Sequence, residues 1–286
     1  MDFSTYKCRC SAIGHLTAYS RGEEPITEAQ LKRIEYLQNK ETKQTPAQLE
    51  ELAKLINKRD NKSLSFSETH IGNLLDWYAW ETACKMPINK ETMEVPAMVK
   101  GTVVEPESVI LLSIVDGVEY KIHKERISND YLSGSLDVYV GESVMQAQKV
   151  TDIKSIWDYP TFLRAILKEV EPLYRKQVQG YCDITGATEG EVAKCLVDMP
   201  EQIIAQYKYK IASKMGALTD ESPEFLEIWD KFECSMLFGD ILPHKRVHKT
   251  KIEPFTEKER QIVYDRVKQS RDWLFEFHES YNQINL

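Results

Sequence analysis

The sequence predicts a mixed α/β (α+β) fold in which a central mixed β-sheet is flanked by helices. Three observations support this prediction. Helical periodicity dominates the first 115 residues, apolar and polar residues then alternate between 117 and 155, and helical and strand-like segments share the remainder. Chains that combine a run of strands with flanking helices fold as a sheet covered by helices.

We expect a single domain over residues 1–286, a length sufficient for one large domain or two small ones. The sheet core lies at about 95–200. A helical part, 1–94, precedes it, and residues 200–286 add further helices and one basic strand.

The composition is that of an ordinary globular protein, with 42% hydrophobic and 29% charged residues. We expect a cytoplasmic protein, because no run of about 18 apolar residues occurs and the start, MDFSTYKCRC, lacks the basic-then-apolar order of a secretory signal. The net charge of −8 argues against a protein that coats nucleic acid, although it leaves room for a local basic groove.

The cysteines indicate reduced, mostly buried thiols rather than a metal or redox site. They form no Cys-x-x-Cys pair and have no histidine framework for zinc. The six are Cys8, Cys10, Cys84, Cys182, Cys195 and Cys234.

The N-terminal part begins with three predicted helices. Ser11 is the expected N-cap of a short helix over 11–20, Thr27 caps an amphipathic helix, and another helix starts at Pro46. The segment 40–66 is polar, and we expect it to be an insertion that forms a mobile excursion.

Two further helices precede the strands. Ser67 caps the first, and it makes His70 an exposed first-turn residue rather than a metal ligand. The second is an apolar helix, VPAMVKGTVVEPESVILLSIV, which carries Glu105 and which we expect Pro106 to disturb.

Period-two alternation then predicts three strands of one antiparallel run, with turns at Asp116–Gly117 and around Gly141. Their sequences are GVEYKIHK, LSGSLDVYVG and QKVTDIKSI.

Helices and strands share the rest of the chain. The helical stretch TFLRAILKEVEPLYRKQVQGYCDITG is broken by Pro172, and EVAKCLVDM is a strand. The basic run HKRVHKTK, 244–251, is either a solvated edge strand guarded by lysines or a contact for the DNA backbone. Helices are predicted at 200–214, at 222–238 and from Thr256 to about Asn282.

The strand segment VTDIK carries charges that a buried strand does not ordinarily keep. Residues i and i+2 of a strand share a face, so Asp152 and Lys154 point the same way. If LDVYV pairs with VTDIK, Asp137 reaches the same rim, and the Ile153 carbonyl adds another oxygen. The alternative is an exposed edge strand with an ordinary Asp–Lys pair.

Oxygen donors in this arrangement suit Mg²⁺ or Mn²⁺. Such an ion lowers the pKa of a bound water and stabilises charge on phosphoryl oxygens. Lys154 would orient that water, help to deprotonate it, or hold the developing negative charge.

With these residues in hand, the pattern resembles the PD-(D/E)xK nuclease superfamily. It is most similar to the phage-type recombination exonucleases, the lambda exonuclease and YqaJ-like group, which is related to the RecB nuclease domain. Four blocks carry the resemblance in the family's order: GTVVEPE with Glu105, LSGSLDVYV with Asp137, VTDIKS with Asp152 and Lys154, and YRKQVQGY with Gln177 and Tyr181.

The N-terminal segment RCSAIGHL resembles the family's small helix that receives a 5′ phosphate, which implies this role for Ser11 with Arg9 nearby. Two points depart from the family pattern. Pro106 follows Glu105 directly, so Glu107 is an alternative helix acid. Arg9 lies closer to the serine than the family's phosphate-binding arginine does.

The resemblance implies a restriction-endonuclease-like core and a Mg²⁺- or Mn²⁺-dependent exonuclease acting on ends of double-stranded DNA, 5′ to 3′. It assigns metal binding to Glu105, Asp137, Asp152 and the Ile153 carbonyl, catalysis to these side chains with Lys154 and Gln177, and DNA binding to Arg9, Ser11 and Tyr181. It also implies a single-strand annealing partner, a homo-oligomer, and a bacterial or phage-infected host cell.

Two alternatives remain. An iron–sulfur nuclease of the RecB kind would need closely spaced cysteines near the C-terminus, whereas Cys182, Cys195 and Cys234 are scattered. A non-catalytic DNA-end-binding or assembly protein could keep the fold without turnover. The complete set of Asp137, Asp152 and Lys154 favours the enzyme.

Overall fold

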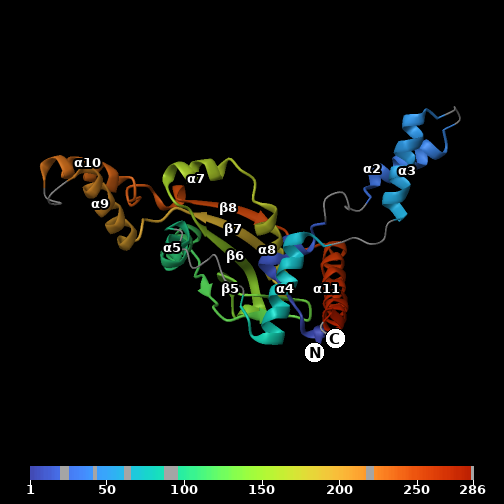
Figure 1. Ribbon diagram of the computed structural model, residues 1–286. Coiled ribbons are helices and arrows are strands. Elements are labelled where there is room, and N and C mark those ends of the chain that lie inside the picture. The colour runs from blue at the N-terminus through green and yellow to red at the C-terminus, as the bar shows by residue number, and fades with distance from the viewer. Residues whose placement is uncertain (20–25, 41–43, 61–65, 87–95, 217–221, 285–286) are drawn as a thin grey trace. The chain divides into compact units, whose positions relative to one another are not determined.

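The computed structural model describes residues 1–19, 26–40, 44–60, 66–86, 96–216 and 222–284 (Figure 1). Parts of the expected excursion, 41–43 and 61–65, lie outside these ranges. The described chain divides into two compact units. The helical unit comprises Met1–Ser4, Gly14–Met86 and Asp265–Leu286, and the sheet unit comprises Thr5–Ile13 and Pro87–Tyr264. None of the described helices is both long and apolar enough to cross a membrane.

The sheet unit is built on a five-stranded mixed sheet, which confirms the predicted fold class. Its order is β2-β5-β6-β7-β8, and β5 to β8 lie side by side in Figure 1. The central pair, β6 and β7, is parallel, and the other neighbours are antiparallel. The strands are β2 (Lys121–Ile122), β5 (Val138–Gly141), β6 (Ala147–Ser155), β7 (Glu189–Cys195) and β8 (Val247–Ile252).

One strand prediction is wrong, because the predicted strand belongs to two different sheets. The segment LSGSLDVYVG is not a single strand but two, β4 (Leu132–Gly134) and β5. β4 belongs to a separate small sheet, where it pairs with β1 (Cys8–Arg9) and β3 (Ile127–Ser128). Because the chain changes sheets between the two strands, Asp137 lies directly before the first residue of β5.

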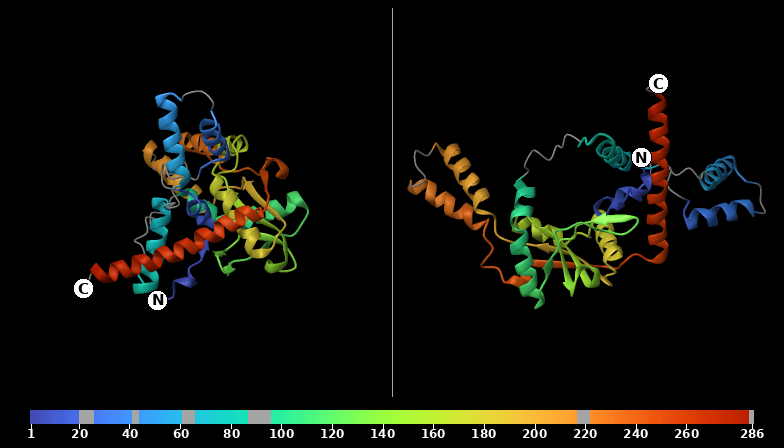
Figure 2. Two further views of the ribbon diagram at one scale, coloured as in Figure 1. Left: turned by 90° about the vertical axis from the view of Figure 1, so that its right-hand side faces the viewer. Right: turned by 90° about the horizontal axis from the view of Figure 1, so that it is seen from below.

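Helices cover both faces of the main sheet; Figure 2 shows the same elements from two other sides. On one face, α6 (Glu105–Asp116) contributes Leu112 to a core that includes Ile153 and Ala193. On the other, α8 (Pro172–Thr185) contacts β6, β7 and β8. Gly190 on β7 permits this close packing, since a Cβ there would lie 2.6 Å from Val178 of α8.

Pro106 divides the expected apolar helix into α5 (Pro96–Val103) and α6 instead of bending it. It occupies the first turn of α6, where its missing N–H is not needed for an intrahelical bond. The expected turn at Asp116–Gly117 is the end of this helix, with Gly117 as its left-handed C-cap (φ 64°). Glu105 is therefore the first residue of α6.

A buried lysine joins α5 to the sheet. Lys100 is 1% exposed, and its ammonium donates to the carbonyls of Ile156, Trp157 and Val197 at 2.9, 2.9 and 2.8 Å. All three N–H donors are thus used, although burial still lowers the pKa of Lys100 to about 8. The bonds hold α5 against the chain that continues from the ends of β6 and β7.

The remaining helices of this unit largely follow the prediction. Pro172 opens α8 and separates it from α7 (Tyr159–Ile166), while α9 (Glu201–Met215) and α10 (Pro223–Cys234) share one apolar cluster. The basic run forms the edge strand β8. Two of its lysines are ion-paired, Lys249 with Asp116 and Lys251 with Glu253, which supports the edge-strand interpretation.

The helical unit contains α2 (Glu28–Gln38), α3 (Pro46–Asp60), α4 (Glu68–Ala83) and most of α11 (Glu257–Ile284). Two of the predicted caps are confirmed: Thr27 forms a capping box with Gln30, and Ser67 accepts from the N–H of His70. The helix expected over 11–20 is shorter and begins later.

Two expectations about the first 94 residues are wrong. Ser11 is not an N-cap, because it lies inside the 3₁₀ turn η2 (Cys10–Ala12), which leads into the four-residue helix α1 (Ile13–Leu16). His70 is not exposed but fully buried, and its Nε2 lies 2.9 Å from Ser270 Oγ on α11. The partner is 200 residues away in sequence, beyond the reach of a local pattern.

The burial of His70 predicts acid sensitivity. Burial, reinforced by the positive charge of Arg266, lowers the pKa of His70 from 6.5 to about 4. The folded state therefore keeps its full stability above pH 6.5 and loses it as the pH falls towards 4, where the unfolded chain binds the extra proton. Between pH 7 and pH 5 we expect His70 to remove about 2 kcal/mol of unfolding free energy. Urea unfolding of wild type and His70→Gln at both pH values measures this difference; equal losses would contradict it.

Candidate active site

The site lies where β5 begins beside the longer strand β6. β5 starts at Val138, opposite Thr151, so β6 continues beyond its neighbour on that side. The N–H of Ile153 donates to Asp137 Oδ2 at 2.8 Å instead of to a strand carbonyl. In an extended strand, the N–H and C=O of one residue point to the same edge. The Ile153 carbonyl therefore faces the Asp137 side, as the predicted ligand set requires.

Asp152 and Lys154 share one face of β6, as the alternation predicts. Lys154 Nζ lies 3.1 Å from Asp152 Oδ1 and 2.9 Å from Oδ2, and 4.5 Å from the centre of the Tyr174 ring. Burial lowers the pKa of Lys154, but the charge and hydrogen bond of Asp152, together with Asp137 and Tyr174, leave that pKa above its ordinary value. Lys154 is consequently a cation at neutral pH.

The two aspartates oppose each other electrostatically. Asp152 is fully buried, and burial together with the nearby Asp137 raises its pKa to about 6 despite the attraction of Lys154. Burial also raises the pKa of Asp137, although its bond to the Ile153 N–H counteracts the rise. A divalent cation between them would relieve this repulsion.

The donor set fits a hard cation. Asp152 Oδ2 is buried, and among the described residues only the Lys154 ammonium, 2.9 Å away, approaches it. Within the described ranges, no group of three His, Cys, Asp or Glu side chains lies close enough together to enclose an ion. Two carboxylates, one carbonyl and several waters match the open oxygen coordination of Mg²⁺ better than a protein cage.

Gln177 and Tyr181 lie one turn apart on α8 and support Asp152. Gln177 Nε2 donates to Asp152 Oδ1 at 3.1 Å and to the Tyr181 hydroxyl at 2.8 Å. Tyr181 is only 4% exposed. It therefore contacts Gln177 inside the protein rather than facing the surface. In this position its hydroxyl can hold the Gln177 amide in place.

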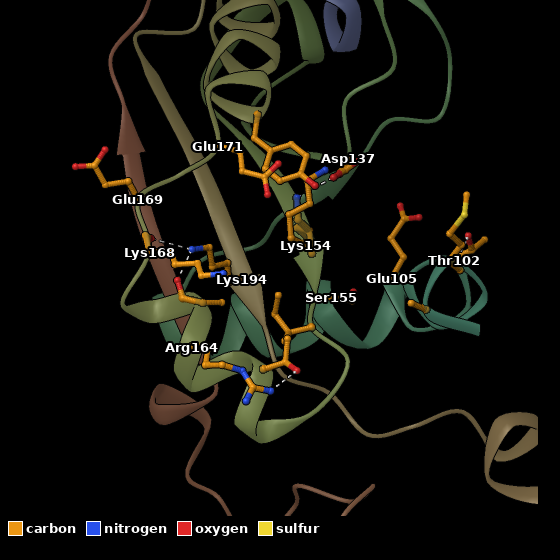
Figure 3. Close-up of a pocket in the computed structure, with 18 residues that line it drawn as sticks. Thr102, Glu105, Asp137, Lys154, Ser155, Arg164, Lys168, Glu169, Glu171 and Lys194 are labelled. Atoms are coloured by element: carbon orange, nitrogen blue, oxygen red, sulfur yellow. Dashed lines mark hydrogen bonds between the residues drawn. The ribbon is translucent and has the colours of Figure 1, made fainter. Parts of the chain in front are cut away.

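An open cleft of about 820 Å³ lies beside these groups (Figure 3). Asp137, Ile153 and Lys154 line it, and so does Glu105, whose pKa is raised by burial and by the charge of Asp137. Glu107 is exposed and is not part of the lining. The geometry thus favours Glu105 as the helix acid. The fully buried Asp152 does not line the cleft itself.

Arg9 and Ser11 belong to another part of the sheet unit. Both are exposed, and neither lines the cleft. Arg9 ends β1, and η2, which holds Ser11, packs against α8 and β4. Gly134 and Gly180 permit this close packing, because a Cβ on either would lie 3.0 Å from the sulfur of Cys10.

The cysteines show no cluster. Four of the six are buried, as expected, and Cys84 and Cys234 are exposed; all six are free thiols. Burial raises the pKa of Cys182 and Cys195 to about 12, which keeps them as neutral thiols.

Two features of the site have no counterpart in the prediction. Lys100 is one: it fixes the helix pair that carries Glu105, yet a single lysine in a helix gives no sign of three carbonyl partners up to 97 residues away. The second is a basic wall of the cleft formed by Arg164, Lys168 and Lys194. The amphipathic spacing of 161–168 is its only signal in the sequence.

Comparison with solved structures identifies the fold. A crystal structure of a phage-related exonuclease from Haemophilus somnus 129PT aligns over 97% of both chains, with a TM-score of 0.58 and 15% identity. The crystal structure of an alkaline exonuclease from Laribacter hongkongensis aligns over 99% of this chain and 96% of that one, with a TM-score of 0.52 and 11% identity. The chain has the fold of these exonucleases. This confirms the fold that the four sequence blocks imply.

The likeness lies in structure and not in overall sequence. No family model and no curated protein sequence matches the chain. At such low identity a shared fold does not by itself establish an activity, so the chemistry must be argued from the side chains of the site.

The bridge from Tyr181 through Gln177 to Asp152 predicts energetic coupling. Gln177→Ala removes the donor to the buried Tyr181 hydroxyl, and we expect it to lower the unfolding free energy by about 1–3 kcal/mol. In Gln177→Ala/Tyr181→Phe that hydroxyl is gone as well, so the double variant should lose less than the sum of the single losses. Urea unfolding of all four proteins completes the cycle, and strictly additive losses would contradict the coupling.

Proposed function

We propose that the protein is a metal-dependent deoxyribonuclease that degrades linear double-stranded DNA from an end, 5′ to 3′. One observation carries the proposal: Asp137 and Asp152 lie together at the end of β6 with the cation of Lys154, beside an open cleft. The exonuclease-like fold supports the same class of reaction.

Asp137, Asp152 and the Ile153 carbonyl are the proposed ligands of a Mg²⁺ or Mn²⁺ ion, with Glu105 supporting that ion or a second one. When bound, the ion supplies a water of lowered pKa and positive charge near the phosphoryl oxygens. This assignment is consistent with the raised pKa of Asp152, because a cation would compensate for the charge that burial disfavours.

Lys154 is proposed to stabilise negative charge on the reacting phosphate and to orient the attacking water. Its raised pKa favours this electrostatic role over that of a general base, since the ammonium has no lone pair to accept a proton. Gln177 is proposed to fix the orientation of Asp152, with Tyr181 holding Gln177 in turn.

Recognition of the DNA end is proposed for Arg9 and Ser11, which would receive the terminal 5′ phosphate. The resemblance is the support for this role and for the 5′ to 3′ polarity. The exposed position of both residues is compatible with it. The same resemblance suggests a single-strand annealing partner, assembly into a homo-oligomer, and work in a bacterial or phage-infected cell.

The decisive experiment follows a linear, 5′-phosphorylated duplex incubated with Mg²⁺, beside a sample with EDTA. We expect progressive loss of DNA from its ends only with the ion. Lys154→Ala should reduce the rate by about 100-fold or more, because a cation near the developing charge is lost. Lys210→Ala, an exposed lysine on α9 outside the cleft, is the matched control and should keep the wild-type rate.

Labels on the 5′ and 3′ ends separate the possible outcomes. Early release of the 5′ label supports the proposed polarity, and early release of the 3′ label reverses it. Binding without any cleavage in Mg²⁺ would favour a DNA-end-binding protein. Equal rates for wild type and Lys154→Ala would show that the reaction takes place elsewhere.

The ion site also predicts a stability effect that does not depend on turnover. At pH 8 the Asp152 carboxylate is charged against the preference of its surroundings, and Asp152→Asn removes that charge while keeping an acceptor for Gln177. Without metal we expect the variant to be more stable than wild type by roughly 1–3 kcal/mol. Mg²⁺ should then raise the melting temperature of wild type and not that of Asp152→Asn. Equal stabilisation of both proteins by Mg²⁺ would place the ion elsewhere.

A further inference from the structure

Helix α7 forms one wall of the cleft and is firmly anchored. Its N-cap, Asp158, accepts from the N–H of Thr161 at 2.7 Å. Phe162 is 1% exposed and packs in a cluster with Leu196 and Phe238. These contacts fix the buried side of the helix. The 3.6-residue period then determines which residues lie on its opposite side.

Four residues of this segment line the cleft at the spacing of one helical face. They are Thr161, Arg164 and Ala165 of α7, at i, i+3 and i+4, and Lys168, two positions beyond the last helical residue, Ile166; together they form the α7 face. The face thus presents one hydroxyl and two cations to the cleft. Arg164 is also oriented by its own helix, since its guanidinium lies 3.4 Å from the Thr161 hydroxyl.

A third cation stiffens the end of this face. Lys194, on β7, donates to the carbonyl of Ala165 at 2.6 Å and lies 3.4 Å from that of Lys168. The Ala165 carbonyl lies in the last turn of α7, where a positive charge is favourable. Lys194 is therefore occupied with holding the backbone, which leaves Arg164 and Lys168 as the groups that can meet a ligand.

Both of these cations are accessible to a ligand in the cleft. Arg164 and Lys168 are exposed, and within the described part of the chain no acid forms an ion pair with either. Figure 3 shows them across Lys154 from Asp137 and Glu105. Glu169 and Glu171 also line the cleft, but the charge of Glu171 acts on Lys194, which compensates for part of it.

We propose that the α7 face of Thr161, Arg164 and Lys168 binds the sugar–phosphate backbone of the DNA strand whose scissile phosphate lies at Asp137 and Lys154. Phosphate oxygens are the chemical group recognised, because a guanidinium, an ammonium and a hydroxyl are all hydrogen-bond donors, and such donors make most of their DNA contacts with the sugar–phosphate backbone. The proposal deepens the proposed nuclease function and rests on it. The face would hold the strand in register while the carboxylate side of the cleft performs the hydrolysis.

The test measures DNA binding separately from cleavage. Wild type, Arg164→Gln/Lys168→Gln and Lys210→Gln/Lys214→Gln are titrated with a fluorescein-labelled, 5′-phosphorylated duplex in EDTA at several NaCl concentrations. The control pair has the same charge change and the same four-residue spacing on an exposed helix, α9, outside the cleft. Cleavage with Mg²⁺ is recorded in parallel, and melting temperatures verify that all three proteins are folded.

Loss of two phosphate contacts should reduce the slope of log K against log salt by roughly 1.8 for the α7 variant. Its affinity should fall about tenfold or more at low salt, with little change for the control pair. Arg164→Lys, which keeps the charge, should retain most of the slope. This result would support the proposal whether or not the duplex is cleaved.

Two results would overturn it. If the α7 variant binds like wild type and the control, the face is not a phosphate site, even where wild type cleaves DNA and the nuclease function stands. If wild type neither binds nor cleaves the duplex, both proposals fail together. If wild type binds without cleaving and the α7 variant alone loses affinity, the nuclease function fails and the phosphate site stands.

Discussion

The hydrogen bond from the Ile153 N–H to the Asp137 carboxylate is the contact on which the site depends. It exists because β5 begins at Val138 and leaves the last part of β6 without a neighbour on that side. The open strand end supplies a donor for one carboxylate and directs the Ile153 carbonyl to the same side. Without this bond, nothing in the strand pairing would hold Asp137 beside the like charge of Asp152.

Placing the Asp137 and Asp152 carboxylates together in a buried position is electrostatically unfavourable, and contacts with the surrounding structure offset part of that free energy. The raised pKa of Asp152 shows that its charged form is disfavoured by burial and by Asp137. Lys154 and Gln177 offset part of this, and Lys100 fixes the helix pair that brings Glu105 to the cleft. Functional sites commonly keep such locally unfavourable arrangements, because many contacts in the rest of the fold hold them in place.

Sequence reasoning succeeded where a local period determines the geometry. Asp152 and Lys154 share a strand face, Gln177 and Tyr181 share a helix face, and the caps at Thr27 and Ser67 form as expected. It failed where distant segments meet. The division of the 132–141 segment depends on pairing with β1, and the carbonyls that Lys100 meets and the burial of His70 are equally non-local. Periodicity identifies a face but not the partner that covers it.

The distribution of charge around the cleft explains how an acidic protein can suit an anionic substrate. The net charge of −8 describes the whole chain, whereas a bound strand experiences mainly the groups within about a Debye length. At the cleft, Asp137 and Glu105 are positioned for a cation, and Arg164 and Lys168 remain unpaired with acids in the described chain. A phosphodiester needs both kinds of surface, since a metal-binding side alone would repel it whenever the ion is absent. The basic face of α7 supplies the attraction that the carboxylates cannot.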